Sequence, residues 1–121
     1  METLVVGDLR IETRDFGPSA PVQLLWKGKS NNRHPGETLT PYFATVLEAA
    51  SQRKVPVELH FEKLDHFNSS TITSIIELIQ DSRIRGIKLI IVYDHALKWQ
   101  KLSFDALRVF AKDDLLELRA A

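Results

Sequence analysis

Five hydroxyl side chains lie within six residues near the middle of the chain. The cluster comprises Ser69, Ser70, Thr71, Thr73 and Ser74. It directly follows Asn68, and an apolar pattern with helical spacing runs through it. Asn, Ser and Thr are favoured at helix starts because their side chains accept hydrogen bonds from free backbone N–H groups. Such capping accounts for one or two of these hydroxyls, but not for all five.

A hydroxyl at a helix start is also a suitable place for a phosphate group. Free N–H groups and the positive end of the helix dipole favour an anion there, by about 0.3–2 kcal/mol, which is too little to refold a domain. A phosphate adds a charge of about −1.5 to −2. Burying that charge at an apolar protein interface costs several kcal/mol, and each ~1.4 kcal/mol is tenfold in affinity. Phosphorylation here is therefore expected to release a docked protein.

The residues around the cluster predict a strand, a helix and a second strand. Val57 to Leu64 alternates apolar and polar residues, which is typical of a strand with one buried face. The helix ends before Gly86. The unbroken apolar run within Ile87–Tyr93 is typical of a strand covered on both sides. Isoleucines at i, i+3, i+4 and i+7 predict one apolar helix face: Ile72, Ile75, Ile76 and Ile79.

The remaining elements complete the order β-β-α-β-α-β-α-β. The short turn at 15–21 favours antiparallel pairing of the first two strands. Strands that alternate with helices predict right-handed crossovers and a mostly parallel sheet. We therefore expect one α/β domain over residues 1–121, with a mixed sheet, an N-terminal antiparallel strand pair and helices packed on the sheet. These further elements are strands at Leu4–Arg14, Val22–Lys27 and Leu115–Leu118, a helix capped by Thr40-Pro41 that runs to about Gln52, and a helix capped by Ser103 with Leu107 and Phe110 pointing inward.

Ligands and partners of such sheets meet the loops at the carboxyl ends of the strands. Here those loops are expected at 65–68 and 94–98, which places the start of the central helix on this rim. The polar stretch Gly28–Glu37 is interpreted as a solvated surface loop, with a recognition loop as the alternative.

Composition and charge exclude several classes of function. The 16 basic and 16 acidic residues cancel, which argues against nucleic acid as the main partner. There is no cysteine, hence no disulfide or thiolate chemistry. No apolar run reaches the roughly 18 residues of a membrane span. The first residues carry no basic region typical of a signal peptide, so we expect a cytoplasmic location.

Catalytic arrangements fit the sequence poorly. The four histidines are scattered, without the spacing of a metal site: His34, His60, His66 and His95. Ser69 with His66 or His95 and Asp94 could form a hydrolase triad, but the glycine pattern of a nucleophile elbow is missing. A phosphoaspartate receiver at Asp65 would need a cluster of acids for Mg²⁺, which is absent. We expect no enzyme activity, no cofactor and no metal.

The order of elements and the motif Leu64-Asp65-His66-Phe67-Asn68-Ser69-Ser70 resemble the STAS domain, which includes the anti-sigma factor antagonists of bacterial partner-switching systems. The family pattern here is Asp-Ser-Ser-Gly-Leu-Gly. Asn68 stands for the Asp, Ser69 for the phosphorylated residue and Ser70 for the next serine, while Thr71-Ile72-Thr73 replaces Gly-Leu-Gly. The Phe67-Asn68-Ser69-Ser70 form looks closer to the SiaC-type branch, which reads Phe-Asn-Thr-Ser.

The resemblance implies a non-enzymatic switch protein. Its partners would be a serine/threonine kinase of the anti-sigma factor type, a phosphatase and a downstream regulator, either a diguanylate cyclase or an anti-sigma factor. Ser69 would be the phosphoacceptor, with Ser70 and Thr71 as alternates. The residues expected to dock partners are Asp65, His66, Asn68, Ser70, Thr73, Trp99 and Lys101.

Two other functions compete with the switch. A constitutive structural or scaffolding subunit would bury the helix start in a permanent interface and leave Ser69 inaccessible. A small hydrolase would need a pocket with a strongly perturbed titrating group at the rim. Trp99 is interpreted equally well as a core residue and as a docking residue.

Overall fold

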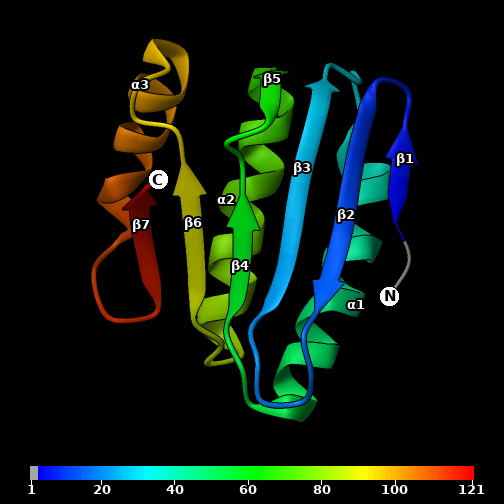
Figure 1. Ribbon diagram of the computed structural model, residues 1–121, viewed down its shortest axis with the longest axis vertical. Helices are drawn as coiled ribbons and strands as arrows, with labels where there is room; N and C mark the ends of the chain where they lie inside the picture. Colours follow the sequence, from blue (N-terminus) through cyan, green and yellow to red (C-terminus); the bar gives the residue numbers. More distant parts are fainter. Residues whose placement is uncertain (1–2) are drawn as a thin grey trace.

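A seven-stranded sheet forms one layer of the protein and three helices form the other (Figure 1). The computed structural model describes residues 3–121. The strands are β1 Leu4–Val6, β2 Leu9–Asp15, β3 Val22–Ser30, β4 Val57–His60, β5 Leu64–Phe67, β6 Leu89–Tyr93 and β7 Leu116–Ala120. The helices are α1 Gly36–Arg53, α2 Ser69–Ile84 and α3 Lys98–Ala106, and a 3-10 turn at Leu107–Phe110 follows α3.

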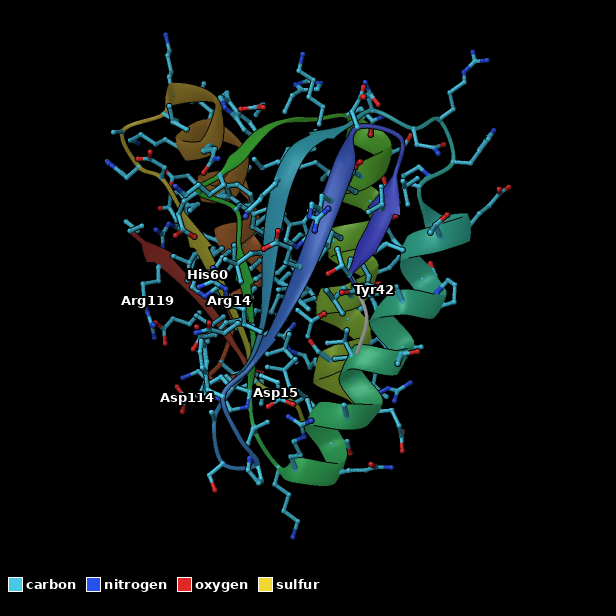
Figure 2. The ribbon with its side chains drawn as sticks, turned by 45° about the vertical axis from the view of Figure 1, so that its right-hand side comes forward. Arg14, Asp15, Tyr42, His60, Asp114 and Arg119 are labelled. Atoms are coloured by element: carbon cyan, nitrogen blue, oxygen red, sulfur yellow. The ribbon has the colours of Figure 1, made fainter. Side chains whose placement is uncertain are left out.

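The sheet is mixed, as predicted. Its order is β1-β2-β3-β4-β6-β7, and β5 pairs with the end of β3. The pairs β1-β2 and β2-β3 are antiparallel, and all other pairs are parallel. Each crossover from β3 onward steps in the same direction across the sheet, so right-handed crossovers must place every helix on one face. Figures 1 and 2 show all three helices on that face.

The two faces of the sheet therefore differ. Leu24, Leu59 and Ile91 are fully buried toward the helices and belong to the hydrophobic core. Every residue of β6 is buried, as expected, although the helices of residues 3–121 cover only one of its faces. Ile90 and Val92 are nevertheless 5% and 6% exposed. Long side chains flank them in register and shield them: Glu58 and Glu117 beside Ile90, and His60 and Arg119 beside Val92.

The strand expected at Val57–Leu64 is two strands. β4 ends at His60 and pairs with β3 and β6, whereas β5 begins at Leu64 and pairs only with the end of β3. Between them, the carbonyl oxygen of Phe61 accepts hydrogen bonds from Leu64 N and from Gln100 Nε2, at 2.9 and 2.6 Å. These two hydrogen bonds stabilise the turn between β4 and β5. In consequence, the expected loop at 65–68 is mostly strand β5.

The helix predicted to be capped by Thr40 begins one turn earlier, at Gly36. Pro35 already has helical backbone angles, φ −64° and ψ −26°, and proline is compatible with a helix start because its missing N–H needs no partner there. The extra turn buries Leu39, which is 1% exposed. Pro41 then lies inside α1 on the exposed side, where water can reach the carbonyl group that it leaves without a donor.

The last helix also begins earlier than predicted, at Lys98 instead of after Ser103. No side chain caps it. Its position depends on Gln100 and Phe104, which are both fully buried and lie four residues apart on one helix face. Leu107 points inward as expected, but from the 3-10 turn.

Candidate functional site

The start of α2 lies at the carboxyl-terminal end of the sheet, on the predicted rim. Figure 1 shows the end of β5, the start of α2, the loop after β3 and the start of α3 at the same end of the molecule. β5 leads directly into α2, with one residue between them, Asn68. The site expected from the sequence is therefore positioned by two strands and two helices.

Asn68 caps α2, as predicted. Its backbone is extended, with φ −92° and ψ 175°. Its side-chain Oδ1 accepts hydrogen bonds from Thr71 N at 2.9 Å and from Thr71 Oγ1 at 2.8 Å. Its Nδ2 donates to the carbonyl oxygen of Asn32 at 2.8 Å. The Asn68 side chain thus caps the helix and also hydrogen-bonds the loop after β3.

Thr71 has a structural role at this helix start. It is fully buried, as is most of Ser30. The two hydroxyl oxygens are 2.7 Å apart, and Thr71 Oγ1 lies 3.3 Å from the carbonyl oxygen of Ser30. This pair links α2 to the end of β3. Burial closes Thr71 to a modifying enzyme, which leaves Ser69 and Ser70 as the reachable members of the three candidate phosphoacceptors.

Ser69 is the exposed hydroxyl in the first turn of α2. Within residues 3–121 its side chain makes no hydrogen bond, and neither does that of half-buried Ser70. Thr73 is exposed and donates to the carbonyl oxygen of Ser69 at 3.3 Å. Ser74 is only 5% exposed. The hydroxyl cluster therefore contains three kinds of side chain. Thr71 is buried and hydrogen-bonded, and Thr73 is exposed and hydrogen-bonded. Ser69, Ser70 and Ser74 make no side-chain hydrogen bond within residues 3–121.

An open hollow of about 340 Å³ lies beside the start of α2. Arg33 and His34 border it from the loop after β3, and Gly36 and Glu37 from the start of α1. Ser70 is among the residues that line it from α2. The polar stretch 28–37, interpreted from the sequence as a surface loop, is instead the end of β3, a loop at 31–35 and the start of α1. Its spacing did not show that Ser30 and Asn32 would bond to the start of α2.

The remaining predicted docking residues form a second group on the same rim. Asp65 and His66 are exposed on β5. Trp99 at the start of α3 is half-buried, and its ring packs edge-on against Phe67, with ring centroids 5.2 Å apart. The ring centroids of His66 and Trp99 lie 6.4 Å apart. The structure thus bears out the packing of Trp99 on the core, while its role in docking stays a prediction.

Lys101 is bonded within its own helix. Its Nζ donates to Asp105 Oδ2 at 3.0 Å, and this hydrogen bond holds the pKa of the Asp105 carboxyl below its usual range. Tyr93 donates to Asp105 Oδ1 at 3.1 Å, and Arg108 donates to the Tyr93 hydroxyl at 2.8 Å. The bond to Tyr93 also raises the pKa of Arg108. This network anchors α3 to β6.

The residues of the hydrolase alternative are not hydrogen-bonded to one another within residues 3–121. Asp94 Oδ1 accepts from the backbone N of Ala96 at 2.9 Å, and no hydrogen bond among the described residues joins Ser69, a histidine and Asp94. The ring contacts of His66 and His95 are with Trp99 and Tyr93. Across residues 3–121, no group of three or more His, Asp or Glu side chains is placed to hold a metal ion.

The sequence was compared with models of protein families and with curated proteins. Neither comparison found a match to this chain. None of the helices in residues 3–121 combines the length and the apolar character needed to cross a membrane.

Proposed function

We propose that this protein is a STAS-like switch of a bacterial partner-switching system, controlled by phosphorylation of Ser69. A serine/threonine kinase of the anti-sigma factor type adds the phosphate, a phosphatase removes it, and the unmodified form binds a downstream regulator in the cytoplasm. The observation that carries the proposal is the state of Ser69. It is exposed in the first turn of α2, and its hydroxyl has no structural task because Asn68 caps the helix.

The α/β architecture and the Phe67-Asn68-Ser69-Ser70 motif support this assignment. The departure from the family's glycines is accommodated locally, since Thr71, at the first glycine position, hydrogen-bonds Ser30 and Asn68. Asn68 is neutral, so it would not repel a phosphate on the next residue. The rim around Asp65, His66 and Trp99 offers the surface on which partners would compete.

The helix start explains how a phosphate would be tolerated. The first N–H groups of a helix have no intrahelical acceptor. Asn68 supplies one for Thr71, whereas the N–H groups of Ser69 and Ser70 have none within the described residues. A phosphate there gains about 0.3–2 kcal/mol from the helix dipole, so the fold persists. The same charge opposes an apolar partner surface much more strongly, so binding is the property that changes.

Phosphorylation is tested by incubating the purified protein with a lysate of its source organism and ATP, followed by phosphosite mapping with mass spectrometry. We expect phosphate on Ser69 and its loss in Ser69→Ala. Thr73→Ala, which removes an exposed hydroxyl one turn further along α2, serves as the matched control and should still be modified. A phosphate found only at residues outside the start of α2 would refute the assignment.

Binding is tested with the partner that the unmodified protein retains from the same lysate, once that partner has been identified and purified. Ser69→Asp should abolish the interaction, because a carboxylate at this position meets the apolar docking surface of the partner. Ser51→Asp, at the far end of α1, should bind normally. Circular dichroism spectra of the three proteins should coincide. Equal binding by Ser69→Asp and the wild type would instead favour a constitutive subunit.

A further inference from the structure

A groove runs between the first half of α1 and the part of α2 from Ser70 to Asp81. It consists of the open hollow of about 340 Å³ described above and an adjoining one of about 240 Å³. Both hollows are lined by Ser74 and Glu77. The second is also lined by Thr40 and Phe43 of α1 and by Leu78 and Asp81 of α2. Its walls therefore combine hydroxyls, carboxylates and apolar side chains.

The floor of the groove carries a polar group without a partner. Ser74 is 5% exposed, lines both hollows, and its hydroxyl makes no hydrogen bond within residues 3–121. Gly36 faces it from α1, since a Cβ atom at Gly36 would lie 3.7 Å from Ser74 Oγ. The missing side chain leaves the space above this hydroxyl open. Ser74 Oγ is not one of the fully buried side-chain atoms that lack a hydrogen bond, so this oxygen itself reaches the hollow. A ligand with an N–H donor would supply the partner.

The charge of the groove indicates the sign of that ligand. Glu77 and Glu37 make no ion pair with any described residue. Asp81, one turn beyond Glu77, is already paired with Arg85 at 3.3 Å. The basic side chains that border the groove are Arg33 and His34, which line the first hollow from the loop after β3 but do not line the second. The second hollow, which Ser74, Glu77 and Asp81 line, is therefore acidic and open to a cation.

The chemistry of the walls selects a guanidinium group. A guanidinium is planar, weakly hydrated and carries five N–H donors, so it can serve a carboxylate and a hydroxyl together while its aliphatic stem contacts apolar side chains. Glu77 and Ser74 provide the acceptors. Phe43 and Leu78, which are 4% and 3% exposed, provide an apolar wall. A lysine ammonium is more strongly hydrated and lacks the planar fork.

We propose that this groove binds an arginine side chain presented by a protein partner. The guanidinium donates to the carboxylate of Glu77 and to the hydroxyl of Ser74. The groove opens beside Ser70, so a partner that docks on the start of α2 reaches it with a neighbouring residue. This recognition goes beyond the phosphorylation switch and does not depend on modification of Ser69.

The test uses NMR titration of the 15N-labelled protein with the peptide acetyl-Gly-Arg-Gly-amide. We expect saturable shifts of the amide signals of Gly36, Ser74 and Glu77. The same peptide with citrulline, which keeps the shape and removes the charge, should bind about tenfold more weakly, since a charge-assisted hydrogen bond is lost. The lysine peptide should also bind more weakly. Equal binding of the citrulline peptide, or tighter binding of the lysine peptide, would overturn the proposal.

Variants separate this groove from general attraction to acidic residues. Glu77→Gln and Ser74→Ala should each weaken binding of the arginine peptide severalfold. Asp114→Asn, which removes an exposed carboxylate in the loop before β7, should not change it. Unaltered affinity in Glu77→Gln would contradict the assignment, and because this side chain is exposed, the variant is expected to fold. Ser69→Ala should bind the peptide normally, so failure of the phosphorylation proposal and failure of this one are distinguishable.

Discussion

The two ends of α2 treat their polar side chains differently. At the C-terminal end, Arg83 donates to the carbonyl oxygen of Phe110 at 2.8 Å and pairs with Asp113, while Arg85 pairs with Asp81 and Glu48. Ser82 donates to the carbonyl oxygen of Ile79 at 2.9 Å. These polar side chains therefore all have partners within the protein itself.

At the N-terminal end of α2, only some of the polar side chains have hydrogen-bond partners within the described residues. Asn68 and Thr71 are bonded to each other and to the end of β3, whereas the hydroxyls of Ser69, Ser70 and Ser74 have no partner within the described residues. Polar groups that the fold does not satisfy are available to a partner or a modifying enzyme. The two ends therefore differ in how many polar side chains the fold leaves without a partner, and the proposed function places the switch at the end that leaves more. The predictions below test that division.

The largest effect is expected from Thr71→Val, which removes the buried, hydrogen-bonded hydroxyl at the N-terminal end of α2. The change keeps the shape of the side chain but leaves Ser30 without its buried hydroxyl partner, at a cost of about 1–3 kcal/mol in the free energy of unfolding. Urea unfolding measures it. Ser69→Ala is the matched control, because its exposed hydroxyl bonds nothing in the described chain, and it should change stability by less than about 0.5 kcal/mol. Similar losses in both variants would erase the distinction between the two hydroxyls.

A smaller effect is expected from Asn68→Ala, because the cap is lost while the core is kept. Removal of a capping Asn typically costs about 1 kcal/mol. The bond to the carbonyl oxygen of Asn32 is lost as well, so amide hydrogen exchange should accelerate in the loop at 31–35. Exchange near Phe110, at the other end of α2, should stay unchanged. Unchanged exchange in the loop at 31–35 would mean that Asn68 does not hold it.

The smallest effect concerns pH and the C-terminal end of α2. The hydrogen bond from Arg83, together with that from the backbone N of Leu115, lowers the pKa of Asp113. A carboxyl with a lowered folded-state pKa stabilises the protein above its unfolded pKa and loses that contribution as the pH falls through the folded value. Asp113→Asn should therefore be slightly less stable than the wild type at pH 7.

The same difference should vanish in strongly acidic solution, as thermal unfolding at a series of pH values would show. Asp114→Asn, the neighbouring exposed carboxyl, is the control and should follow the wild type throughout. A difference between Asp113→Asn and the wild type that persists in strong acid would mean that the ion pair with Arg83 is not its source.

Much of the fold could be predicted from local patterns. The apolar alternation in β4, the isoleucine stripe of α2 and the unbroken apolar run of β6 each correspond to an element of the structure. These patterns depend on the period of the backbone, which is a property of neighbouring residues. The alternation of strands and helices also predicted the mixed sheet, because crossover handedness leaves few other arrangements.

Element boundaries and the surroundings of the site could not be predicted in the same way. The break between β4 and β5 depends on Gln100, which lies 39 residues along the chain from Phe61 and bonds its carbonyl oxygen. The early start of α1 depends on the burial of Leu39. At the site, the role of Thr71 depends on Ser30, which lies 41 residues away in sequence. No local pattern contains such pairs.

By itself, the sequence determined the α/β class with its mixed sheet, the suitability of Asn68 as a helix cap and the presence of more hydroxyls than a cap needs. Those features follow from residue type and spacing. The tertiary structure alone decided which hydroxyls are spare, because that depends on what other segments bring to them. Ser30 hydrogen-bonds the hydroxyl of Thr71, while Gly36 brings no side chain to Ser74 and leaves the groove between α1 and α2 open.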